Sequence, residues 1–212
     1  MILYSYWRST TSFRVRAALN LKKVDYTLVS VDLVAGEQHG DVYRAVNPGY
    51  GVPALQLNDG TVLTQSLAII DYLDATFPEP PMVSSDPALR AKQLAAALTV
   101  ATDVHPVNNL RVLSRLEGQF GANADDKVSW MRHWMAEGFS ALEALLPGGV
   151  EYAFGNTPDL ADICIVVQCV NAHRFGLSLD PYPKVARIEA NCLAVPEIAA
   201  AAPDAQPEAE KS

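Results

Sequence analysis

The chain has 212 residues, of which 50% are hydrophobic, and a formal net charge of −8. This length allows one large domain or two small ones, and no apolar run approaches the roughly 20 residues that a membrane span needs. The acidic balance argues against nucleic acid or a membrane surface as a partner. The first 24 residues differ, because they contain five basic residues and no acidic one. This local excess of positive charge indicates an anionic ligand.

The cysteines bear on the cellular compartment. Their number is odd, they lie in apolar stretches, and they have neither metal-ligand spacing nor a Cys-x-x-Cys arrangement. The chain begins with a strand-like run, so we expect no signal peptide. We therefore predict buried free thiols in a reducing compartment, a cytoplasmic location and no metal site. The cysteines are Cys164, Cys169 and Cys192.

The first part of the chain alternates predicted strands and helices. Apolar patterning predicts strands at 2–6, 26–31, 53–57 and 62–64, and helices at 13–21, at 41–46 and after Ser66. Asn58-Asp59-Gly60 predicts a tight hairpin between the last two strands. The order β-α-β-α-β-β-α is the pattern of a thioredoxin-like unit.

Strand signals fade after the proline-rich stretch 77–81. Apolar periodicity then predicts helices at 89–108, 127–146, 160–175 and 182–193. Asp159 and Asp162 fit the N-cap and N3 positions of the third of these helices. The last residues are rich in Pro, Ala and Glu, which favours disorder. The sequence thus predicts an α/β domain at 1–82, an all-helical domain at 88–202 and a disordered tail at 203–212.

A block of hydroxyl residues at 9–12 lies where the first strand turns into the first helix. A helix N-terminus offers free N–H groups and positive potential to an anion. A serine hydroxyl at this point can donate to a thiolate or an oxyanion. The plainer alternative is that Ser9 only caps the helix. Arg8 adds a positive charge at the mouth of the turn.

Two later positions offer comparable chemistry. A cis proline at Val52-Pro53 would turn the N–H and C=O of Val52 toward a peptide-like ligand. A trans proline at the start of a strand is more common, and we expect it here. Gln65 and Ser66 precede another helix, where Ser66 either holds a carboxylate or acts as a plain cap.

These motifs occur in a fixed order together with Asn47-Pro48 and the stretch 103–109. In that order the chain resembles the zeta-class glutathione transferases, and among them the bacterial maleylpyruvate and maleylacetoacetate isomerases. The resemblance covers about residues 1–200. It implies the glutathione transferase fold, glutathione as cofactor, a homodimer and a role in aromatic catabolism. The implied reaction is reversible thiolate addition that converts a maleyl ketoacid to its fumaryl isomer.

The resemblance implies roles at matching positions of the first domain. Ser9 would stabilise the glutathione thiolate, with Thr11 nearby, and Val52 at Pro53 would pair with the cysteinyl unit. Arg8 would hold the substrate beside Ser9. The residues for the two ends of glutathione are Gln65 and Ser66 at the γ-glutamyl carboxylate and Gln38 at the glycyl end.

The resemblance implies further roles in the second domain. Asp103 would reach glutathione across a subunit interface, and His105, Asn108 and Asn109 would line the same region. Arg111 and Arg174, with the arginine of the first domain, would hold the two carboxylates of the substrate, because arginine binds carboxylates bidentately. A surface salt bridge to Glu117 or Asp103 is the alternative for Arg111.

Other functions remain open from the sequence. A general conjugating or dehalogenating glutathione transferase is one alternative, and a non-enzymatic binding protein on the same fold is another. Ser9 favours an enzyme, because it retains the thiol-stabilising hydroxyl. Thr11 stands where the maleylacetoacetate branch commonly has cysteine, which favours the maleylpyruvate branch slightly.

Overall fold

The computed structural model describes residues 1–211, which form two units. The N-terminal unit contains Met1–Met82 together with the end of the chain from Ala194. The helical unit contains Val83–Leu193. The predicted domains differ from this division, because the segment after 193 belongs to the first unit.

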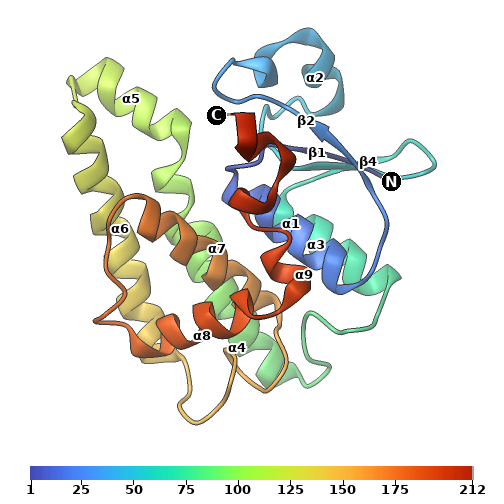
Figure 1. Ribbon diagram of the computed structural model, residues 1–212, viewed down its shortest axis with the longest axis vertical. Coiled ribbons are helices and arrows are strands. Elements are labelled where there is room, and N and C mark those ends of the chain that lie inside the picture. The colour runs from blue at the N-terminus through green and yellow to red at the C-terminus, as the bar shows by residue number, and fades with distance from the viewer. Residues whose placement is uncertain (212) are drawn as a thin grey trace. The chain divides into compact units, whose positions relative to one another are not determined.

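The N-terminal unit is built on a four-stranded mixed sheet in the order β2-β1-β3-β4. β1 pairs in parallel with β2 and antiparallel with β3, and β3 pairs antiparallel with β4. Figure 1 shows α1 and α3 on one face of the sheet and α2 on the other. This arrangement confirms the predicted thioredoxin-like unit. The elements are β1 (Ile2–Ser5), α1 (Thr10–Leu21), β2 (Thr27–Ser30), η1 (Glu37–His39), α2 (Asp41–Val46), β3 (Ala54–Gln56), β4 (Val62–Thr64) and α3 (Ser66–Thr76).

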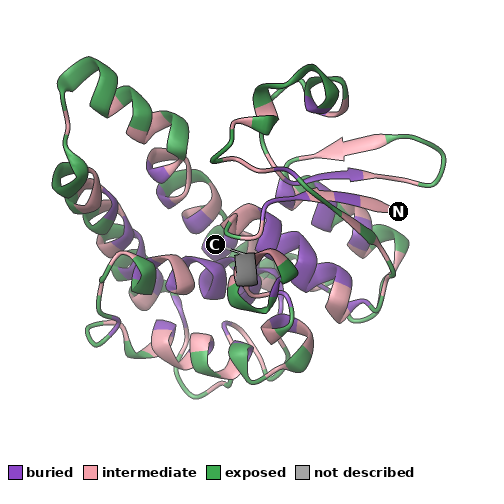
Figure 2. Cartoon of the chain, turned by 45° about the horizontal axis from the view of Figure 1, so that its top comes forward, coloured by how far each residue is buried: buried purple, intermediate pink, exposed green. Residues whose placement is uncertain are grey.

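The helix α1 forms the centre of this unit. Every residue from Ser12 to Leu19 is buried, including two arginines, and Figure 2 shows this burial along the helix. The predicted hairpin joins β3 to β4, where Gly60 has a φ of +90° and donates its N–H to Leu57 O. A positive φ suits glycine because it has no Cβ. The core therefore lies between the sheet and the pair α1 and α3.

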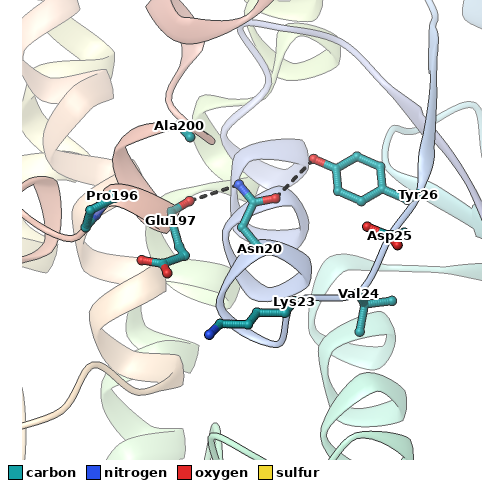
Figure 3. A pocket seen from close by; sticks show the side chains of 8 residues that line it. All are labelled: Asn20, Lys23, Val24, Asp25, Tyr26, Pro196, Glu197 and Ala200. Atoms are coloured by element: carbon teal, nitrogen blue, oxygen red, sulfur yellow. Dashed lines mark hydrogen bonds between the residues drawn. The ribbon is translucent and has the colours of Figure 1, made fainter.

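The end of the chain returns to α1. Arg16 Nε donates to Ala201 O at 2.9 Å, and Asn20 Nδ2 donates to Glu197 O at 2.9 Å. Figure 3 shows Asn20 between Glu197 and Tyr26, beside a shallow hollow of about 530 Å³ at the C-terminal end of α1. The returning segment contains α9 (Pro196–Ala199), η4 (Pro203–Ala205) and η5 (Pro207–Lys211).

The predictions for the C-terminal residues were therefore wrong in two respects. Residues 194–202 do not belong to the helical unit, and 203–211 form two 3₁₀ helices instead of a disordered tail. Ser212 lies outside the described residues. Composition alone missed this, because the segment is held by donors on α1, the buried Arg16 and the half-buried Asn20, that need carbonyl partners.

The helical unit is assembled around α7. Residues 160–169 of this helix are all buried, whereas α5 buries none of its residues. The predicted helix at 89–108 is divided into an α-helix, a π-helix and a 3₁₀ helix, and α5 was not predicted. The elements are α4 (Pro87–Leu98), η2 (Thr99–Val104), η3 (Pro106–Asn108), α5 (Leu110–Phe120), α6 (Ala124–Leu145), α7 (Leu160–Arg174) and α8 (Pro183–Leu193).

The predicted capping arrangement at the start of α7 is confirmed. Asp159 Oδ1 accepts from the Ala161 and Asp162 N–H groups, and Asp162 Oδ2 accepts from the Asp159 N–H at 2.9 Å. Gln93 Nε2 donates to Asp159 Oδ2, and the Ala153 N–H donates to Asp162 Oδ1. Burial raises the pKa of both carboxyl groups, and that of Asp162 the more strongly. The two acids thus join three segments of the unit.

The cysteines lie in the core of the helical unit. Cys164, Cys169 and Cys192 are buried free thiols, as predicted. Burial raises the pKa of the Cys169 and Cys192 thiols well above the usual range, which keeps them protonated. Among residues 1–211, no helix has both the length and the apolar character needed to cross a membrane.

Candidate active site

Ser9 is held at the junction of β1 and α1. It is the N-cap of α1, and its Oγ accepts from the Ser12 N–H at 3.2 Å. Its Oγ also lies 2.8 Å from Thr11 Oγ1, which donates to Val52 O at 2.8 Å. Because Thr11 gives its single proton to Val52, Ser9 is the donor in the Ser9–Thr11 pair. In capping the helix, Ser9 Oγ only accepts a hydrogen bond, so the proton of its hydroxyl group can still be donated.

The Val52-Pro53 peptide bond is cis, so the expected trans bond is wrong. The preceding loop is fixed by two donors to Gly51 O, Tyr43 Oη and Asn47 Nδ2, each at 2.6 Å. Burial raises the pKa of Tyr43 to about 12, which keeps its phenol protonated. These contacts come from α2 and the turn after it, so the sequence next to the proline was not enough to predict them.

The N-terminus of α3 is arranged differently from that of α1. Gln65 is the N-cap, with a φ of +69° and no side-chain capping bond, and Ser66 is the first helical residue. The alternative that Ser66 is a plain N-cap is therefore wrong. A positive φ at a residue other than glycine carries strain, which is typical of functional sites. The first turn of α3 thus keeps N–H groups that suit an anion.

A buried arginine supports this second helix N-terminus. Arg14 on α1 is 1% exposed, and its Nη1 donates to Ser66 Oγ at 3.3 Å. Local sequence patterns predicted no role for Arg14. The available signal was the pair Arg14 and Arg16 in a helix stretch whose other residues are apolar or small.

The remaining predicted residues of the N-terminal unit are Gln38 and Arg8. Gln38 is half-buried on η1, and its Nε2 donates to Leu33 O at 3.4 Å. Arg8 is exposed, and its guanidinium lies 4.2 Å from the centre of the Trp7 ring. Arg8 thus directly precedes the serine that caps α1, with its charge in solvent.

In the helical unit, most of the predicted residues lie in one short stretch. Asp103 is exposed on η2, where its Oδ1 accepts from Thr102 Oγ1. Asn108 is buried, and Asn109 caps α5 by accepting from the Arg111 N–H at 3.2 Å. His105 is half-buried between η2 and η3.

The two arginines of the helical unit are both exposed. Arg111 lies in the first turn of α5, and Glu117, one of the acids considered as its partner, pairs with Lys127 at 2.8 Å. Arg174 is the last residue of α7, with its guanidinium 5.2 Å from the centre of the Phe175 ring. Both side chains can therefore meet an anion from solvent.

The comparisons with known proteins agree with one another. Residues 3–81 match the family model described as the glutathione S-transferase N-terminal domain. A probable maleylacetoacetate isomerase of Vibrio cholerae is 43% identical over 99% of this chain and 98% of its own length. A bacterial zeta-class maleylpyruvate isomerase structure has a TM-score of 0.95 and 42% identity, and covers 98% of this chain and 99% of that chain.

A further solved structure carries ligands. The maleylacetoacetate isomerase of Anaeromyxobacter dehalogenans, with dicarboxyethyl glutathione and citrate in its active site, has a TM-score of 0.87. It is 39% identical, and the match covers 98% of this chain and 96% of that chain. Identity of this size over almost the whole length shows the family. The chain belongs to the zeta-class glutathione transferases, the family of the maleylacetoacetate and maleylpyruvate isomerases.

Proposed function

We propose that this protein is a glutathione-dependent isomerase that converts a maleyl ketoacid to its fumaryl isomer. The observation that carries the proposal is the pair of helix N-termini in the N-terminal unit. One presents the Ser9 hydroxyl, and the other presents Ser66 above a buried arginine. These groups suit the thiol and the carboxylate of one tripeptide.

The residues present fit glutathione in chemical terms. Val52 beside a cis proline offers backbone groups to the cysteinyl unit, and Gln65 and Ser66 at the start of α3 offer donors to the γ-glutamyl carboxylate. Gln38 would meet the glycyl end. When bound, glutathione supplies a sulfur nucleophile that adds reversibly to the activated double bond, so that this bond is single, and can rotate, while the sulfur is attached. The thiols of the chain itself are unsuited, because Cys169 and Cys192 are buried and protonated.

Ser9 acts on the sulfur in this proposal. It can turn its proton from Thr11 to a thiolate, while the Ser12 N–H continues to hold its oxygen. A hydrogen bond to the charged form of a thiol, together with the positive end of α1, lowers the thiol pKa. Thr11 remains bonded to Val52 O and keeps the loop in place.

The arginines bind the substrate in this proposal. A maleyl ketoacid carries two carboxylates, and negative charge develops on its conjugated carbonyl during addition. Arg8, Arg111 and Arg174 are exposed guanidinium groups, which pair with carboxylates bidentately. Fixed cations of this kind stabilise both the ground-state carboxylates and the developing charge. The relative that holds a dicarboxyethyl adduct of glutathione supports this assignment.

Assembly and location are part of the same proposal. We expect a homodimer in which Asp103, which is exposed on η2, contacts glutathione held by the other subunit. His105, Asn108 and Asn109 would line that region. A cytoplasmic location fits the free cysteines. Size-exclusion chromatography with light scattering tests the dimer, and a monomer at micromolar concentration would remove the role of Asp103.

The decisive experiment is a comparison of maleylpyruvate and maleylacetoacetate, each assayed with and without glutathione. We expect formation of the fumaryl isomer only with glutathione present, and constant glutathione during turnover. The ratio of kcat/KM for the two ketoacids identifies the preferred substrate. Absence of isomerisation of both compounds in the presence of glutathione would refute the proposed function.

A further inference from the structure

The segment 99–109 of the helical unit has an unusual backbone and carries several of the proposed site residues. Its first part, η2, is a π-helix, whose hydrogen bonds span five residues instead of four. Helices of this type are rare and occur frequently at functional sites. Asp103 is exposed on η2, Asn108 is the last residue of η3, and Asn109 follows it. The contacts that fix this segment therefore matter for the site.

The helix α6 holds the segment at two points. Trp130 Nε1 donates to Val107 O at 2.9 Å, which fixes the backbone of η3. Further along α6, the buried Gly138 packs directly against Val104, which is 2% exposed and ends η2. The two contacts are about two helical turns apart on α6. They therefore fix both the position and the direction of the segment.

The contact at Gly138 requires the absence of a side chain. A Cβ atom placed on this glycine would overlap Val104 Cγ2. Glycine inside a helix lowers stability relative to alanine, so its place in the middle of α6 needs a compensating gain. Gly118 inside α5 gives the comparison, because a Cβ there meets no atom of the described residues within 4 Å. The close packing of η2 on α6 is the gain at Gly138.

The same contact determines the position of Asp103. Val104 packs on α6, while its neighbour Asp103 is exposed, with Oδ1 3.0 Å from Thr102 Oγ1. Packed interiors contain few voids, so an added methyl group forces its neighbours to move. A side chain at position 138 would push Val104 away from α6 and would displace the turn that carries Asp103.

We propose that Gly138 is a positioning residue for glutathione binding, acting through Val104 on Asp103. Trp130 supports the other end of the same segment through Val107 O. This inference rests on the proposed function, in which Asp103 contacts glutathione held by the other subunit. A substitution in the interior of α6 then changes the affinity for a ligand that α6 does not touch.

The experiment measures glutathione affinity by isothermal titration calorimetry. For Gly138→Ala we expect the affinity to fall about tenfold, the effect of losing one hydrogen bond to a charged group. In an Asp103→Ala background the same substitution should change the affinity less than about twofold, because the contact is already absent. Unchanged affinity in Gly138→Ala, or the same loss with and without Asp103, would overturn the inference.

A second substitution should restore binding. Val104→Ala removes the methyl groups that the new Cβ would meet. The variant with both Gly138→Ala and Val104→Ala should therefore bind glutathione within about twofold of Val104→Ala alone. An undiminished loss of affinity in the double variant would contradict action through Val104.

Matched variants separate positioning from folding. Gly118→Ala adds the same methyl group to a helix where there is space, and it should leave the affinity unchanged. A purely structural role of Gly138 would lower the melting temperature and leave the affinity of the folded protein intact. If Gly138→Ala does not fold, Trp130→Phe takes its place, because it removes only the bond to Val107 O. Its loss of affinity should likewise disappear in the Asp103→Ala background.

The two proposals fail in different ways. If the wild-type protein does not bind glutathione, the proposed function fails. If it binds glutathione and Gly138→Ala keeps the wild-type affinity, only the positioning role fails. Light scattering should show the same oligomeric state for Gly138→Ala and the wild type. Loss of affinity by dissociation of subunits would contradict the action on Asp103.

Discussion

The two units bury charges of opposite sign. Among the residues whose burial the structure describes, the N-terminal unit buries Arg14, Arg16 and Lys22, and the helical unit buries Asp159 and Asp162. The acids accept from backbone N–H groups and begin a helix. Two of the cations donate to backbone carbonyls, and the third donates to a hydroxyl of the candidate site.

This difference separates structural charge from functional charge. Arg16, Lys22 and Asp159 each bond several groups of their own unit, both backbone and side chain, and therefore serve folding. Arg14 instead contacts Ser66 at the start of α3, a residue of the candidate site. The helical unit instead carries its proposed ligand-binding cations, Arg111 and Arg174, at its surface.

The largest expected effect is the loss of a structural cation. Lys22 Nζ donates to Asp74 Oδ1, Phe77 O and Pro80 O at 2.6 to 2.8 Å. Lys22→Met leaves these acceptors without their charged partner, which should lower the free energy of unfolding by about 3–5 kcal/mol. Urea denaturation followed by circular dichroism measures this. The exposed Lys23→Met is the control, with an expected change within about 0.5 kcal/mol. Equal effects of the two substitutions would show that Lys22 is not structural.

The next effect concerns the thiolate. Ser9→Ala removes the proposed donor and should lower kcat about 100-fold, the usual effect of deleting one stabilising donor. The KM for glutathione should change far less, because the other contacts remain. Loss of the helix cap costs about 1 kcal/mol of stability, measured separately by thermal melting. Ser9→Thr keeps a hydroxyl and serves as the control. A loss confined to glutathione affinity would contradict the assignment.

A smaller effect is expected at the exposed arginines. Arg111→Ala and Arg174→Ala should each raise the KM for the dicarboxylate about tenfold, with little change in glutathione binding. Arg8→Ala should act in the same direction from the other unit. Arg115→Ala, an exposed position on the same helix as Arg111, is the control. If Arg115→Ala raises KM as much, general electrostatic attraction explains the effect and the specific contacts do not exist.

The smallest expected effect is a change in the stability of the fold with pH. Because burial raises the folded-state pKa of Asp159 and Asp162, the folded chain binds more protons than the unfolded chain above about pH 4. Stability should therefore fall as pH rises from about 4 through the raised pKa values. Asp162→Asn should be less stable overall but show a weaker decline with pH, measured by urea denaturation at several pH values. The exposed Asp180→Asn should retain the wild-type slope.

Sequence patterns predicted the elements that local chemistry determines. Ser9 at the helix start, the Asn58-Asp59-Gly60 hairpin and the Asp159 capping box depend on residues a few positions apart, and all three are present. The hydroxyls at 9–12 and the arginines also carried enough signal to suggest an anion site.

Features that depend on distant residues escaped the sequence analysis. The cis bond at Pro53 lies in a loop held by Tyr43 and Asn47, and Arg14 contacts Ser66, a residue 52 positions later in the chain. The helix α5 was missed although Val112, Leu113 and Leu116 have helical spacing; none of its residues is buried. Tertiary contacts decide such cases and leave little trace in a local pattern.

The return of the chain end to α1 has a consequence for protein engineering. Because residues on both sides of Val83–Leu193 belong to one unit, the helical unit is an insertion with two junctions. Helical units could be exchanged between relatives to transfer substrate preference. Such an exchange must preserve both junctions and the hydrogen bonds that Arg16 and Asn20 donate to the returning segment. A chimera made by a single crossover near residue 82 would instead replace part of its own N-terminal scaffold.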